Sequence, residues 1–175
     1  MELVEGTVTV GGERFPDTDA FVEALSAAGG ERGVTVQAFD ARYVVSRAHL
    51  ERAVELAERA FERGENVARD RGVEIMLYAA GRRQIDRALT LGVSRGRNPV
   101  VVLIDAPDGG PAADEDEANA AAAIEELLAP ESTLGGYDET RVREFFDVGD
   151  PELEAVDGDL ADVVLERVAL LDVEK

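Results

Sequence analysis

The sequence has no cysteine and no tryptophan, and it contains a single histidine, His49. Because cysteine is missing, disulfide bonds, thiolate nucleophiles and thiolate zinc sites are excluded. His49 lies in the first turn of a predicted helix, where we expect it to face solvent, and no motif places carboxylates around it for a metal site or a catalytic triad. No glycine-rich phosphate loop with a lysine occurs, which argues against autonomous ATP hydrolysis. The sequence therefore predicts a protein that is not an enzyme, with no catalytic residue, no metal and no cofactor.

Long apolar runs are missing as well. No segment approaches the roughly 20 apolar residues that a membrane-spanning helix needs, and the first residues, Met1–Glu5, are acidic where a signal peptide would be basic. We therefore expect a cytoplasmic protein without membrane contact. A length of 175 residues suits one domain, residues 1–175, with one hydrophobic core.

Basic residues are scarce relative to acidic ones. The chain has 18 basic and 38 acidic residues and a net charge of −20. Salt near 1 M, where the Debye length is about 3 Å, screens the repulsion within such a surface, so the composition indicates halophilic adaptation. The alternative is an acidic patch that recruits a basic partner, which is less favoured because acidic residues occur along the whole chain. Unfolding in dilute buffer would support the halophilic interpretation.

The middle of the sequence departs from this pattern. Residues 42–97 carry 12 basic and 8 acidic side chains, which gives them a net charge of +4 in a chain of −20. We expect an anionic partner to bind this part of the chain.

The hydrophobic periodicity predicts an α/β fold of the α+β type, with a small mixed, largely antiparallel sheet of about four strands covered by helices. Gly81 bends or divides the helical run that contains Val73 and Ile85. The predicted strands are 2–10, 34–39, 100–104 and an edge strand at 132–136, and the predicted helices are 17–29, 46–64, 73–91, an alanine-rich helix ending at 128, 139–147 and 160–171. Between the third strand and the alanine-rich helix, an acidic surface loop is predicted at about 105–119.

One cluster of residues has a composition suited to RNA. Arginine binds phosphate in a bidentate manner and stacks on bases, glycine permits close backbone approach, and a glutamine amide can read a base edge. We predict an RNA-binding site formed by Arg69, Arg71, Gly81, Arg82, Arg83, Gln84 and Arg87. The alternative, which the composition supports equally well, is that these arginines form salt bridges along their helices with acids such as Glu74 and Asp86.

Glu74 is an acid within a mostly apolar helical run. A buried carboxylate needs a partner or a raised pKa. We favour an ion pair with Arg71 or Arg82 over acid catalysis.

Several segments resemble the small KEOPS-complex subunits related to the human kinase-binding protein TPRKB. The resemblance covers nearly the whole chain, is dense from 36 to 92 and leaves out the acidic loop. It rests on the motifs at 37–44, 49–53 and 74–92, which include the stretch Ala79–Ile85, and on the closing segment Leu165–Leu171.

This resemblance implies a non-catalytic role. The KEOPS complex installs threonylcarbamoyl on an adenosine of certain tRNAs, and in this family the subunit binds the kinase-like ATPase and grips the single-stranded 3′ CCA tail of tRNA. Two other functions remain open: a protein-only regulator of the kinase-like subunit without RNA contact, and a small acid–base enzyme built around Glu74 and His49.

Overall fold

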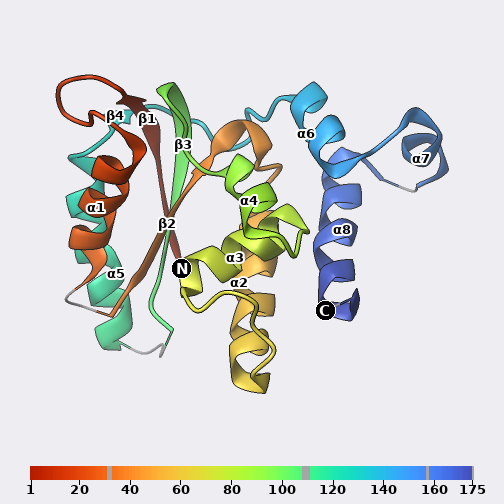
Figure 1. The fold of residues 1–175 in the computed structure, drawn as a ribbon, viewed down its shortest axis with the longest axis horizontal. Helices are drawn as coiled ribbons and strands as arrows, with labels where there is room; N and C mark the ends of the chain where they lie inside the picture. Colours follow the sequence, from red (N-terminus) through yellow and green to blue (C-terminus); the bar gives the residue numbers. More distant parts are fainter. Residues whose placement is uncertain (31–32, 108–110, 157, 175) are drawn as a thin grey trace. The chain divides into compact units, whose positions relative to one another are not determined.

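The computed structural model describes residues 1–30, 33–107, 111–156 and 158–174, which form two compact units. The first unit consists of Met1–Ala41 and Gly92–Thr133, and the second of Arg42–Leu91 and Leu134–Lys175 (Figure 1). Each unit is thus assembled from two separate segments of the chain, which explains why the sequence contains no recognisable linker. The single folding domain expected from the sequence stays a prediction, since two compact units can unfold cooperatively.

The first unit contains an antiparallel sheet of four strands in the order β2-β3-β1-β4. The strands are β1 (Glu2–Val10), β2 (Thr35–Asp40), β3 (Gly96–Asp105) and β4 (Ala129–Pro130). All three strand pairings are antiparallel, so the α+β class is confirmed and the sheet of the described residues has no parallel pair. One of the two inner strands is β3, whose apolar run Val100–Ile104 is completely buried, as its unbroken hydrophobicity predicts.

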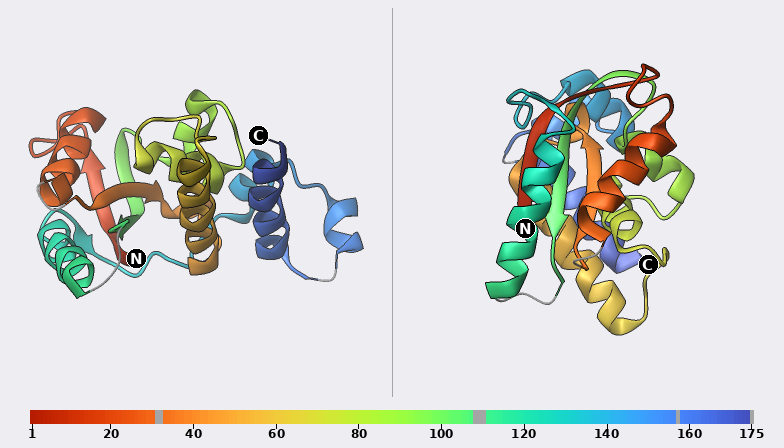
Figure 2. Two further views of the ribbon diagram at one scale, coloured as in Figure 1. Left: turned by 90° about the horizontal axis from the view of Figure 1, so that it is seen from below. Right: turned by 90° about the vertical axis from the view of Figure 1, so that its left-hand side faces the viewer.

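One face of this sheet is covered by α1 (Thr18–Gly29) and α5 (Pro111–Glu125), which lie side by side in all views (Figures 1 and 2). Side chains on alternate positions of each strand point to this face. The resulting core contains Val4, Val8, Phe21, Leu25, Ala38, Val100, Val102, Ile104, Ala120 and Ile124.

The acidic loop predicted at about 105–119 is wrong from residue 111 onward, because α5 begins at Pro111. Residues 108–110 lie outside the described part. Proline in the first helical turn and Asp114 close behind it favour a helix start, and the acidic composition concealed these signals. A buried stripe with helical spacing then faces the core, formed by Ala113, Glu117, Ala120 and Ile124. The buried Glu117 carboxylate accepts a hydrogen bond from the Ala106 amide at 3.1 Å.

The predicted edge strand at 132–136 is also wrong. The edge strand is β4, which pairs with β1 only at Gly6 and Thr7. Beyond Pro130 the chain leaves the edge, and Thr133 donates hydrogen bonds to Val100 O at 2.7 Å and to the Glu5 carboxylate at 2.9 Å.

Gly6 permits this pairing between β1 and β4. A Cβ atom at Gly6 would lie 2.7 Å from Ala129 O and 2.9 Å from the Leu128 Cβ. Any larger residue would therefore push β4 away from β1.

The second unit is helical in its described residues. It contains α2 (Arg47–Arg63), α3 (Arg71–Ala80), α4 (Ile85–Ala88), α6 (Glu139–Phe146), α7 (Asp150–Ala155) and α8 (Leu160–Glu174), and α2 packs against α3 and α8. The predicted caps of α2 are confirmed, since Ser46 accepts a hydrogen bond from His49 N at its start and Gly64 ends it in the left-handed conformation. Gly81, with φ of 63°, ends α3 and divides the predicted helical run.

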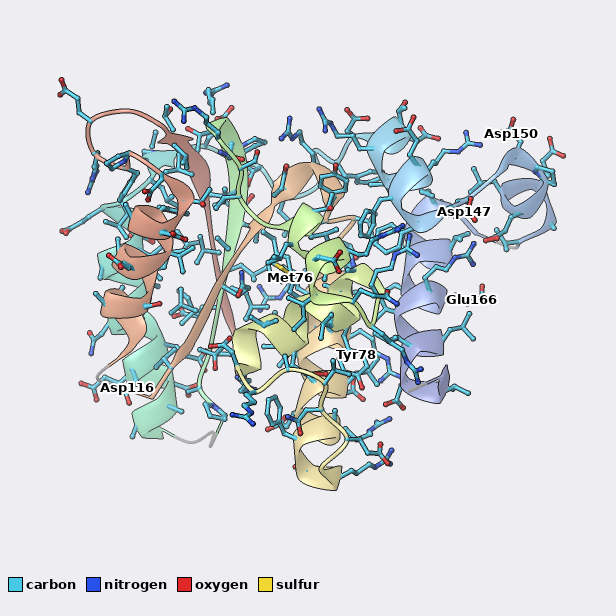
Figure 3. All side chains as sticks on the ribbon, in the orientation of Figure 1. Met76, Tyr78, Asp116, Asp147, Asp150 and Glu166 are labelled. Atoms are coloured by element: carbon cyan, nitrogen blue, oxygen red, sulfur yellow. The ribbon has the colours of Figure 1, made fainter. Side chains whose placement is uncertain are left out.

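The helix α7 has no counterpart among the predicted elements. Asp147 ends α6 with a φ of 55°, and the chain then turns into α7, which begins at Asp150 (Figure 3). Arg143 forms an ion pair with Asp150, and Arg167 pairs with Glu152 at 2.6 Å. No residue of α7 is fully buried, so its sequence carries only a weak hydrophobic pattern. Among the described residues, no helix combines the length and the hydropathy that crossing a membrane requires.

Candidate functional site

The predicted RNA-binding residues lie at the two ends of α3. Arg69 precedes the helix and Arg71 is its first residue, whereas Gly81–Gln84 follow its last residue, Ala80. Ten helical residues span about 15 Å at 1.5 Å per residue. The structure therefore does not bring all of the predicted residues together, and it groups Gly81, Arg82, Arg83, Gln84 and Arg87 at the C-terminal end.

Arg82 has a structural contact that the sequence did not reveal. Its guanidinium lies 5.1 Å from the centre of the Phe145 ring and donates a hydrogen bond to the Phe145 carbonyl. The Arg82 side chain is half-buried. Its guanidinium contacts an aromatic ring and a carbonyl oxygen, whereas the alternative interpretation of the sequence expected a carboxylate partner. Arg82 thus fixes the segment after α3 to the end of α6.

Arg87 faces solvent from the short helix α4 and lines an open cavity of about 340 Å³. We call this cavity the Arg87 groove, and it is lined by Tyr43, Arg87, Thr90, Arg141, Glu144 and Phe145. Arg87 forms no ion pair with any described residue, while Arg141 has an exposed pair with Asp138 at 3.4 Å. Exposed pairs contribute at most about 1 kcal/mol, so Arg141 can exchange Asp138 for an anionic ligand.

The aromatic residues of the Arg87 groove are held by one another. The rings of Tyr43 and Phe145 meet edge to face with centroids 5.8 Å apart, and Phe145 meets Phe146 in the same way at 5.0 Å. Arg83 and Gln84 are exposed at the start of α4, and the Gln84 side chain makes no capping hydrogen bond. Guanidinium groups and aromatic rings, with an exposed amide at the start of α4, match the chemistry of single-stranded nucleotides.

Tyr43, Thr90, Arg141, Glu144 and Phe145 were not identified from the sequence. Three of them come from α6, more than 50 residues after Arg87, and no local pattern relates the two segments. The one available signal was the pair of aromatic residues at 145–146 beside arginines at 141 and 143.

The prediction that His49 faces solvent is wrong, since its side chain is completely buried. Its Nδ1 accepts a hydrogen bond from the Val45 amide at 3.3 Å, so Nε2 carries the proton and donates to Ala79 O at 2.7 Å. Burial lowers the pKa of His49 to about 4, despite the opposing hydrogen bond to the Ala79 carbonyl. His49 is therefore neutral at physiological pH and links the start of α2 to α3.

Glu74 is also completely buried, in the first turn of α3. Its carboxylate accepts hydrogen bonds from the Val67 amide at 2.9 Å and from the Ala68 amide at 3.0 Å. Two backbone amides of the connection between α2 and α3 thus donate to the Glu74 carboxylate, and the ion pair with Arg71 or Arg82 stays a prediction. Because backbone groups engage both Glu74 and His49, the two residues give no support to an acid–base enzyme.

Besides Val67, which is 48% exposed before α3, two pairs of apolar side chains are exposed in the described part of the helical unit. Ile85 and Leu89 lie one turn apart beside Arg87, and Leu170 and Val173 lie one turn apart on α8, with Val173 81% exposed. Within the described ranges, no cluster of histidine, aspartate and glutamate side chains has the arrangement of a metal site.

The chain matches a known protein family. The model of the family described as kinase binding protein CGI-121 matches residues 19–172, which is most of the chain. No individual curated protein matches the sequence. The family match spans both units and includes the residues of the Arg87 groove.

Proposed function

Since this chain belongs to the family of the kinase binding protein CGI-121, as its resemblance to TPRKB-like proteins predicted, we propose that it is a non-catalytic subunit of the KEOPS tRNA-modification complex. In this proposal it binds the kinase-like ATPase subunit and the 3′ CCA tail of tRNA, and it works in a salt-rich cytoplasm. The observation that supports the RNA part is the Arg87 groove, where Arg87, which has no ion pair within the described residues, and the weakly paired Arg141 lie beside aromatic rings.

The chemistry of the Arg87 groove fits the end of a single strand. A cavity of about 340 Å³ is at the small end of ligand sites and accommodates about one nucleotide. Arg87 and Arg141 would bind phosphates, while Tyr43 and Phe145 would contact a base. Glu144 would accept a hydrogen bond from the exocyclic amine that both cytosine and adenine carry. Because stacking and hydrogen bonds persist in salt, this site can operate where phosphate contacts alone would be weakened.

Charge reversal at Arg87 tests the RNA site. We expect Arg87→Glu to weaken tRNA binding at least tenfold, because it replaces a phosphate contact by repulsion, while the exposed position leaves folding intact. The measurement is binding of tRNA with and without its CCA tail in molar salt.

The matched control is Arg63→Glu, which reverses an exposed charge at the end of α2. The affinity of this variant for tRNA should stay within about threefold of the original, because molar salt screens the effect of a charge that lies away from the binding site. Equal affinity for tRNA lacking CCA would contradict the proposal, and retained kinase binding without tRNA binding would establish the protein-only regulator.

The exposed face of α8 is the proposed kinase contact, since adjacent apolar side chains in water mark protein-binding surfaces. We expect Leu170→Asp to weaken binding to the purified kinase-like subunit at least tenfold, because it places a charge in an apolar interface. Val22→Asp on α1 is the control, since Val22 is 49% exposed and Leu170 is 41% exposed. Loss of kinase binding in the Val22 variant, or none in the Leu170 variant, would contradict this assignment.

A further inference from the structure

The outer edge of β1 is only partly covered by β4. The two strands pair at Gly6 and Thr7, and within the described residues no strand lies opposite Leu3 and Val4 on that side. Successive residues of a strand direct their backbone N–H and C=O groups to opposite edges. One residue of the Leu3–Val4 pair therefore directs its backbone groups to the open edge, where a further strand could bond to them.

The chain itself vacates this position. In a continued ladder, Glu131 and Ser132 would lie opposite Glu5 and Val4, following the register of Gly6 with Pro130. Instead, the pairing stops at Pro130, and the Thr133 hydroxyl bonds to the Val100 carbonyl of β3. An open cavity of about 580 Å³ remains beside the edge, and we call it the β1 edge groove. It is lined by Leu3–Glu5, Glu125, Leu128 and Pro130–Ser132.

The lining of the β1 edge groove selects for a cationic ligand. Glu125 at the end of α5 is exposed, and Glu131 is exposed with a pair to Arg97 at 3.2 Å in which both side chains are about half or more accessible. Such a pair is weak and exchanges readily. Among the described residues that line the groove, none is basic. The acidic rim disfavours nucleic acid, and the net charge of −20 disfavours a second copy of this chain.

We propose that the β1 edge groove is a docking site for a short extended peptide segment of a partner protein, with basic side chains in alternation with apolar ones. The peptide adds to β1 as a strand beyond the end of β4, in the mode of β-augmentation. Its backbone bonds to the one residue of the Leu3–Val4 pair whose N–H and C=O groups point to the open edge. Its apolar residues contact Leu3 and Leu128, and its basic residues lie beside Glu125 and Glu131. The groove follows three residues of β1, Leu3–Glu5, so about three peptide residues lie opposite it. This site belongs to the first unit, and the proposal does not depend on the proposed KEOPS function.

The test uses the full chain and a blocked five-residue peptide in which arginine and valine alternate. Binding is followed by amide chemical shifts in the lowest salt at which circular dichroism shows the native helix content. We expect saturable shifts at Leu3 and Val4, and at least a tenfold weaker affinity for the same peptide with N-methylated backbone amides, which cannot add as a strand.

Charge reversal completes the design. The variant Glu125→Lys/Glu131→Lys should lose at least tenfold in affinity, whereas Glu115→Lys/Glu126→Lys, which changes two exposed acids elsewhere on α5 and its end by the same total charge, should change it less than threefold. Equal losses in both variants, equal binding of the N-methylated peptide, or shifts outside the groove would overturn the proposal in favour of diffuse charge attraction. Dimerisation through β1 without peptide binding would overturn it in favour of a second copy.

Discussion

Replacing Glu74 by alanine is expected to lower the free energy of unfolding by about 3 kcal/mol or more. The substitution removes the acceptor of the Val67 and Ala68 amides, and the Ala68 amide lies in a buried environment where water cannot replace the carboxylate. Charge-assisted hydrogen bonds contribute about 1.5–3 kcal/mol each, and a buried unpaired donor adds a further cost. Glu74 also lies in the first turn of α3, where a negative charge interacts favourably with the helix dipole.

Chemical denaturation of Glu74→Ala, Glu74→Gln and Glu62→Ala measures this effect. The glutamine variant keeps one acceptor oxygen and should lose about half as much as alanine, while Glu62→Ala removes an exposed acid of α2 and should change stability by less than about 0.5 kcal/mol. If Glu74→Ala is as stable as Glu62→Ala, the carboxylate does not stabilise the α2–α3 connection.

Acidification from pH 7.5 to 4.5 is expected to cost about 2–3 kcal/mol of stability through His49 alone. The folded state holds the pKa of His49 at about 4, whereas an unfolded chain has a histidine pKa near 6.5. Between these values the unfolded chain binds the proton and the folded chain does not, so stability falls as the pH falls. The contribution is fully present above pH 6.5 and declines continuously down to about pH 4.

The substitution His49→Gln isolates this contribution from the titration of carboxylates. Glutamine can still donate a hydrogen bond to the Ala79 carbonyl, but it does not titrate. Denaturant midpoints measured across this pH range at constant salt should therefore depend less steeply on pH in the variant. Parallel pH profiles for the two proteins would show that His49 is not held neutral by burial.

Elements with strong local signals were predicted correctly. Ser46 and Gly64 bound α2 as capping residues do, and Asp17 accepts a hydrogen bond from the Ala20 amide at the start of α1. The continuous apolar run of β3 predicted a fully buried strand. In each case the residues that determine the element lie within it or next to it.

Elements that depend on distant contacts were missed. The strand β4 forms where Gly6 admits the Ala129 carbonyl, and α7 is held by the arginines of α6 and α8. His49 is buried because backbone groups at Val45 and Ala79 satisfy both of its nitrogens. The pairings of Gly6 with Ala129, Arg167 with Glu152 and His49 with Ala79 join residues far apart in the sequence, and hydrophobic periodicity reports only on near neighbours.

The RNA-binding site stays a prediction, and its residues lie farther apart than their positions in the sequence suggest. Arginines near Gly81 indicated an anionic ligand, but Arg82 stacks on Phe145 and only Arg87 among the predicted residues lines the groove. Sequence proximity placed Arg69 and Arg71 in the same cluster, although the length of α3 separates them from it. Residues one turn apart on a helix are neighbours, but the two ends of a ten-residue helix are far apart.

The assembly of each unit from two chain segments sets an order of events during synthesis. The early helices α2 and α3 leave the ribosome before residues 92–133, and they bury their shared face only when α8 arrives to pack against them. Closing so long a loop is entropically costly and slows folding. The nascent helical unit therefore passes through an interval in which its apolar residues are available to chaperones, and a partner that binds α8 early would delay completion of the fold.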